Sequence, residues 1–88
     1  MEENLRILKD EVNKSLETMH IFVTDIEVRE EKPYKFLTIE LDKIGGIDLD
    51  TIVEATDIIN PIVDKYDFIE DSYILDIISK EQGDGHNE

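Results

Sequence analysis

The chain has 88 residues, of which 40 % are hydrophobic, and its formal net charge is −14 from 23 acidic and 9 basic residues. This length suits one small domain with a modest core. The absence of cysteine excludes a disulfide framework and a zinc–thiolate site, and we expect a reducing compartment. No apolar stretch approaches the roughly 20 residues that span a membrane, and the acidic N-terminus is not a secretory signal, so we expect a cytoplasmic protein.

The negative charge is concentrated in the second half of the chain. Residues 1–44 hold 11 acidic and 7 basic residues, whereas residues 45–88 hold 12 and 2. Such a surface repels nucleic-acid phosphate and attracts a basic partner. Acidity that only keeps the protein in solution explains the charge equally well.

Hydrophobic periodicity predicts a helix and then a hairpin in the first half. Apolar residues recur every three or four positions over about residues 3–19, which predicts a helix. From His20 the period changes to two, and the phase shift near Thr24–Asp25 predicts a bulge or a strand that is apolar on both faces. The polar turn Glu30–Pro33 and the alternating residues 34–42 complete the predicted hairpin.

The second half predicts one helix and one strand. Asp48 is a good N-cap, and Pro61 predicts a kink, or a break near Asn60 followed by one more turn. Residues 64–71 form an acidic connection, 72–79 a third strand and 80–88 a disordered acidic tail. The domain is thus expected over residues 1–79. The helical stripe is predicted at Ile52, Val53, Thr56, Ile59 and Val63.

This order of elements predicts an α+β fold. It is a two-layer α-β-β-α-β arrangement, with two helices on one face of a three-stranded sheet.

The stretch "LDKIGGIDLD", residues 41–50, does not match the known loops that bind ligands. Apolar residues occupy the positions where a calcium loop needs oxygen ligands, and the Gly-Lys-Ser/Thr of a phosphate loop and the dinucleotide fingerprint are absent. No G-x-x-G of an RNA-binding KH module occurs. Gly45 and Gly46 are therefore interpreted as a structural turn.

No constellation of catalytic or metal-binding residues stands out. His20 lies at a helix–strand junction, His86 lies in the tail, and neither has a partner that indicates a nucleophile or a metal site. With 23 carboxylates, coincidental pairs are expected, and none is singled out. We expect no catalysis, no metal and no cofactor.

The segments "VTDIEVREEKPYKFLTIELDKIGGIDLD", "TIVEATDIINPIVD" and "YILDIIS" together resemble the N-terminal domain of the bacterial ribosome maturation factor RimP. The resemblance covers roughly residues 4–79, and the strand–Gly-Gly–helix segment carries most of it. The matching positions are Asp25, Glu27, Asp42, Lys43, Gly45, Gly46, Leu49, Asp50, Tyr73, Leu75 and Asp76.

The sequence departs from the family pattern at three places. Asp57 stands where the family usually has arginine, and "SKEQGDG" replaces the family's "SSPG". The family's C-terminal β-barrel does not occur in this sequence. These departures keep a second hypothesis open, a stand-alone acidic protein-interaction module without the ribosomal role.

The resemblance implies a non-catalytic assembly factor. It would bind the immature small ribosomal subunit through a basic ribosomal protein, without RNA as its main partner, and we expect a monomer. The predicted partner-binding residues are Asp42, Lys43, Asp48, Asp50, Glu54 and Asp57.

Overall fold

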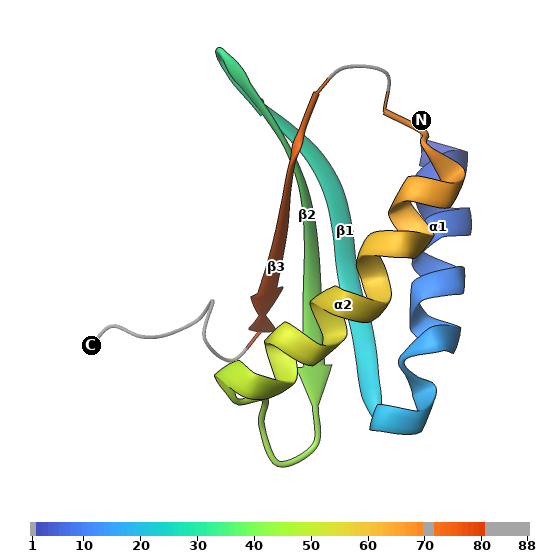
Figure 1. The fold of residues 1–88 in the computed structure, drawn as a ribbon, viewed down its shortest axis with the longest axis vertical. Helices are drawn as coiled ribbons and strands as arrows, with labels where there is room; N and C mark the ends of the chain where they lie inside the picture. Colours follow the sequence, from blue (N-terminus) through green and yellow to red (C-terminus); the bar gives the residue numbers. More distant parts are fainter. Residues whose placement is uncertain (1, 70–71, 81–88) are drawn as a thin grey trace.

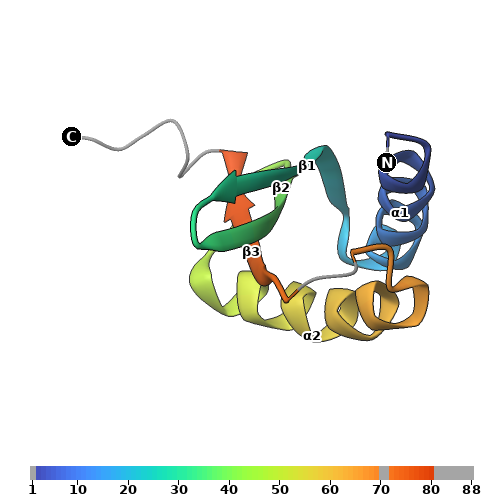
Figure 2. The ribbon, with the colours of Figure 1, turned by 90° about the horizontal axis from the view of Figure 1, so that it is seen from above.

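The computed structural model describes residues 2–69 and 72–80. It contains a three-stranded sheet in the order β1-β2-β3 with two helices, α1 and α2, on one face, which confirms the predicted α+β arrangement (Figure 1). Seen from above, both helices lie on the same side of the sheet (Figure 2). The predicted tail lies outside the described residues, apart from Lys80. No helix in the described part of the chain is long and apolar enough to cross a membrane.

The first predicted helix is divided in two. Helix α1 spans Glu2–Ser15, and a 3-10 helix, η1, spans Glu17–Met19. His20 follows in the left-handed region with φ 60°, and its N–H donates to the Glu17 carbonyl. This reversal ends the helix and starts β1. The apolar stripe of α1 is buried against the sheet, at Leu8 and Val12.

The hairpin forms with a bulge where the sequence changes phase. Strand β1 spans Ile21–Glu31 and pairs antiparallel with β2, Tyr34–Lys43. The register shifts between Val23 and Asp25, which confirms the bulge. Val23 lies opposite Leu41 and Ile26 opposite Ile39, so the bulge keeps the apolar residues of both halves of β1 on the helix-covered face.

Helix α2 spans Leu49–Tyr66, so the predicted break near Asn60 is wrong. Pro61 cannot donate a hydrogen bond to the Asp57 carbonyl, but both residues are exposed, so water can bond to that carbonyl. The predicted connection is correspondingly shorter, because residues 64–66 are still helical. Asp67 then ends the helix with φ 52° and donates its N–H to the Val63 carbonyl.

Strand β3 spans Ile74–Ser79 and pairs parallel with β2, with α2 as the crossover. Leu37, Ile39 and Leu41 of β2 are fully buried between the sheet and the helices, and Ile47 and Ile69 are buried in the segments on either side of α2. The other face of the sheet carries none of the described helices (Figure 2).

Candidate functional site

The "LDKIGGIDLD" segment forms a turn that leads into α2. Gly45 and Gly46 have φ values of 91° and 94°, a region that L side chains rarely adopt, and the Gly46 N–H donates to the Lys43 carbonyl at 2.9 Å. Because the turn reverses the chain, the start of α2 lies beside the end of β2. The turn thereby positions the N-terminal half of α2.

Asp48 is the N-cap of α2, as its sequence position predicted. Its Oδ1 accepts hydrogen bonds from the Thr51 N–H at 2.8 Å and from the Thr51 hydroxyl at 2.6 Å. These bonds, the hydroxyl bond first, hold the pKa of Asp48 below its ordinary value. The Asp48 carboxylate is therefore engaged in starting the helix.

Apart from the N-cap Asp48, the predicted partner-binding residues separate into two places. Asp50, Glu54 and Asp57 are exposed and follow one another along the solvent side of α2 at helical spacing. Asp42 and Lys43 are half-buried at the end of β2, where the Asp42 carboxylate accepts the Lys43 N–H at 2.9 Å. Asp42 pairs with Phe22 in the sheet register. The structure thus brings together the three residues of α2 and keeps Asp42 on the sheet.

Exposed apolar residues lie next to these acids, and the sequence analysis missed them. Ile44 is 87 % exposed, Leu49 70 % and Val53 55 %. Placing Val53 in the buried stripe was wrong, because it lies about 120° around the helix from the buried Ile59. Counting helical angles from Ile59 would have found it. We call Leu49, Asp50, Val53, Glu54 and Asp57 the α2 surface.

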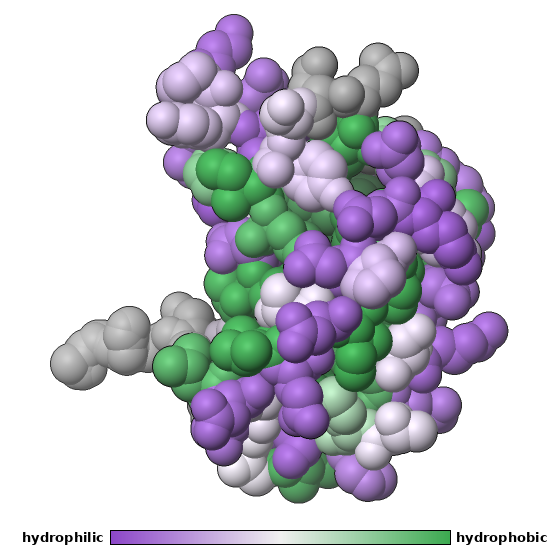
Figure 3. All heavy atoms as spheres, in the orientation of Figure 1, coloured by the Kyte–Doolittle hydropathy of each residue, from purple (hydrophilic) through white to green (hydrophobic). Residues whose placement is uncertain are grey.

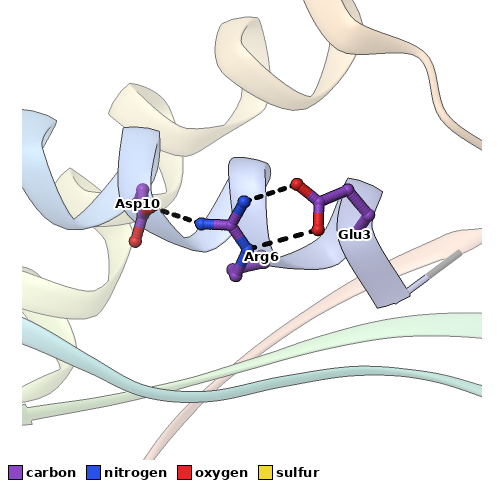
Figure 4. Close-up of polar contacts among 3 residues, drawn as sticks. All are labelled: Glu3, Arg6 and Asp10. Atoms are coloured by element: carbon purple, nitrogen blue, oxygen red, sulfur yellow. Dashed lines mark hydrogen bonds and ion pairs between the residues drawn. The ribbon is translucent and has the colours of Figure 1, made fainter.

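The two arginines, Arg6 and Arg29, are paired with acids on their own elements. Arg6 on α1 forms ion pairs with Glu3 and, at 3.7 Å, with Asp10 (Figure 4). The bonds to Arg6, the hydrogen bond first, lower the pKa of Glu3. Arg29 on β1 pairs with Glu27 and Glu31. Asp50, Glu54 and Asp57 form no ion pair with any described residue, so the α2 surface keeps its negative charge.

The space-filling view shows the same mixture of side chains. Apolar atoms are exposed along the left side of the view, near β3 and the start of α2, beside polar atoms (Figure 3). Exposed apolar area with a charged rim is typical of protein-binding surfaces.

Two shallow grooves on the described surface contain titratable side chains. One, of about 460 Å³, lies between the end of α1 and the start of β1 and is lined by Asp10, Glu17 and His20 among others. No hydrogen bond joins these three side chains. The other is lined by Asp64, Asp67 and Tyr73, and burial, followed by the two carboxylates, raises the pKa of Tyr73. Within residues 2–69 and 72–80, no cluster of three or more histidine and acidic residues suits a metal ion.

The sequence matches a known protein family. The model of the RimP N-terminal domain matches residues 11–80, which is most of the chain and runs from the middle of α1 to the end of β3. The chain therefore belongs to the RimP N-terminal domain family, a family of ribosome maturation factors.

Proposed function

We propose that this protein takes part in maturation of the small ribosomal subunit by binding a basic ribosomal protein through the α2 surface. The observation that carries the proposal is the exposed face of α2, where Asp50, Glu54 and Asp57 lie beside Leu49 and Val53. Unpaired carboxylates attract a cationic surface, and exposed apolar side chains supply area that is buried on binding.

The overall charge supports a protein partner over RNA. A net charge of −14 repels phosphate, whereas ribosomal proteins that neutralise RNA present many basic residues. The proposed binding needs no catalytic group and no cofactor. It acts in the cytoplasm, where ribosomal subunits are assembled.

Co-sedimentation with purified free small subunits tests the proposal. The variant carrying Asp50→Asn, Glu54→Gln and Asp57→Asn removes three charges from the α2 surface. The control variant carries Glu2→Gln, Asp10→Asn and Glu17→Gln, which removes three charges from the exposed side of α1 and η1. Both variants have the same net charge, so position alone distinguishes them.

We expect the α2 variant to bind at least about tenfold more weakly than the control variant, and we expect wild-type binding to weaken as salt rises, because exposed charges are screened over about 10 Å at 0.1 M salt. Equal binding of the two variants, or wild-type binding that does not change with salt, would contradict the proposed surface. Failure of the wild type to bind subunits at any salt would favour an acidic interaction module without the ribosomal role.

A further inference from the structure

The face of the sheet that points away from the helices is a second continuous surface, which we call the open face. Residues paired across neighbouring strands point to the same side of a sheet. The register therefore places three rows side by side from β1 through β2 to β3. These rows are Arg29–Phe36–Ile74, Glu27–Thr38–Asp76 and Asp25–Glu40–Ile78.

The first row and the hairpin end carry exposed apolar side chains. Tyr34 is 57 % exposed and Ile74 46 % exposed. The rings of Tyr34 and Phe36 are 6.4 Å apart, and the Arg29 guanidinium lies 5.8 Å from the centre of the Phe36 ring. Aromatic and aliphatic side chains held in this way form a ready contact area for another protein.

Apart from Thr38, Ile78 and the exposed Phe22 opposite Asp42, the rest of the open face is acidic. Arg29 is the one cation that the strand register places there, and its ion pairs with Glu27 at 3.5 Å and Glu31 at 3.3 Å already occupy it. The remaining acids have no cation within ion-pair distance among the described residues. The carboxylates on this face are Asp25, Glu27, Glu31, Glu40, Asp42 and Asp76.

An unpaired polar atom lies in the middle of this face. Thr38 is only 7 % exposed, and its hydroxyl has no hydrogen-bond partner in the described part of the chain. It stands between Glu27 and Asp76 in the sheet. A buried hydroxyl without a hydrogen-bond partner is uncommon. An ammonium or guanidinium group that enters between the Glu27 and Asp76 side chains could donate a hydrogen bond to the Thr38 hydroxyl oxygen.

We propose that the open face binds an extended, cationic segment of a partner protein, with apolar side chains of that segment packing on Phe36 and Ile74. The six carboxylates and the unpaired hydroxyl favour basic side chains, and the aromatic end favours an apolar anchor. A second copy of this chain is disfavoured, because two chains of net charge −14 repel each other. Nucleic acid is disfavoured for the same reason.

The probe is an acetylated, fluorescently labelled peptide of alternating arginine and leucine, measured by fluorescence anisotropy. The open-face variant carries Asp25→Asn, Glu27→Gln and Asp76→Asn, and it is compared with the α1 control variant of the same net charge. We expect the open-face variant to bind at least about tenfold more weakly and the control to stay within about threefold of the wild type. Circular dichroism checks that all variants are folded.

Two further measurements locate the peptide. Ile74→Ser on the open face should weaken binding, whereas Leu49→Ser on the α2 surface should not; both positions are exposed and apolar. Amide chemical shifts should change along β1, β2 and β3 rather than along α2. Equal loss in the open-face and control variants, or shift changes confined to α2, would overturn the proposal.

The same variants separate this inference from the proposed function. If peptide binding depends on the open face while subunit binding depends on the α2 surface, the two proposals stand independently. If the peptide does not bind, or binds unchanged to the open-face variant, the open-face inference fails, whatever the subunit assay shows.

Discussion

The two faces of the sheet have very different compositions although they are built from the same strands. On β2, Leu37, Ile39 and Leu41 are fully buried beneath the helices, while Phe36 and Glu40, at alternating positions of the same strand, are half-buried on the open face. The covered face stabilises the fold, because burial of apolar area is the main favourable contribution to stability. The open face buries less apolar area and therefore contributes less to stability.

Substitutions on the covered face should cause the largest loss in the free energy of unfolding. Ile39→Ala removes a fully buried side chain and leaves a cavity, so we expect a loss of about 2–5 kcal/mol in the free energy of unfolding. This is a large part of the total stability of a domain this small. Urea denaturation followed by circular dichroism measures it. Glu27→Ala, on the exposed side of β1, is the comparison and should change stability by less than about 0.5 kcal/mol; similar losses in both variants would contradict the contrast between the faces.

The second largest loss of stability is expected in the Gly45–Gly46 turn, which directs α2 to the covered face. Gly45 has φ 91°, and a Cβ atom added there would meet no atom within 4 Å, so Gly45→Ala introduces backbone strain without a clash. We expect a loss of about 1–3 kcal/mol. The adjacent Ile44→Ala, at an exposed position, should cost less than about 0.5 kcal/mol. Thermal melts of the two variants give the comparison, and equal melting temperatures would show that the turn tolerates an L residue.

A smaller effect is expected at the start of α2. Asp48→Ala removes the N-cap hydrogen bonds to Thr51 and should lower the melting temperature by a few degrees, whereas Asp50→Ala, in the same turn, should lower it less.

The cap also predicts a dependence on pH. Because the pKa of Asp48 is lowered in the folded state, its charged form stabilises the fold above the unfolded pKa, near 3.8, and this contribution is lost as pH falls through the lower folded pKa. The difference in melting temperature between wild type and Asp48→Ala should therefore narrow below about pH 3.8. A difference that stays constant between pH 7 and pH 3 would mean that the charge on Asp48 does not contribute.

A substitution on the open face should have the smallest effect on stability, and it should be a gain and not a loss. Thr38→Val replaces an unpaired buried hydroxyl by a methyl group, so stability should stay the same or rise by about 1 kcal/mol. Thr24→Val is the comparison, because its hydroxyl donates to Glu40 Oε1 at 2.7 Å, and this variant should lose stability. A clear loss in Thr38→Val would show that the hydroxyl has a partner in solution.

Local signals explain which parts of this structure could be predicted. The phase change at Thr24–Asp25 predicted a bulge or a strand that is apolar on both faces, and the structure has the bulge. Asp48 predicted the helix start. Both signals depend only on neighbouring residues. Pro61 led to the wrong prediction of a helix break near Asn60. An exposed helix can continue past proline, because water can donate a hydrogen bond to the Asp57 carbonyl that proline cannot reach. Val53 was misplaced because its apolar character says nothing about its angle around the helix.

The open face could not be predicted as a surface. Glu27 and Thr38 lie opposite each other within the hairpin, but Asp76 follows much later in the sequence and joins them only through the parallel pairing of β3 with β2. The α2 acids were easier to group, because helical spacing within one segment places them together.

The parallel pairing of β3 with β2 has a consequence for the order of folding. The hairpin joins residues that are close in sequence, whereas Leu37 and Leu75 meet only after α2 has crossed between them. Contacts between distant residues form more slowly, because a longer loop must close first. On the ribosome that synthesises it, the chain emerges with α1 and the hairpin before β3, so one edge of β2 is unpaired until the last strand emerges. We therefore expect β3 to be the last strand to join the sheet.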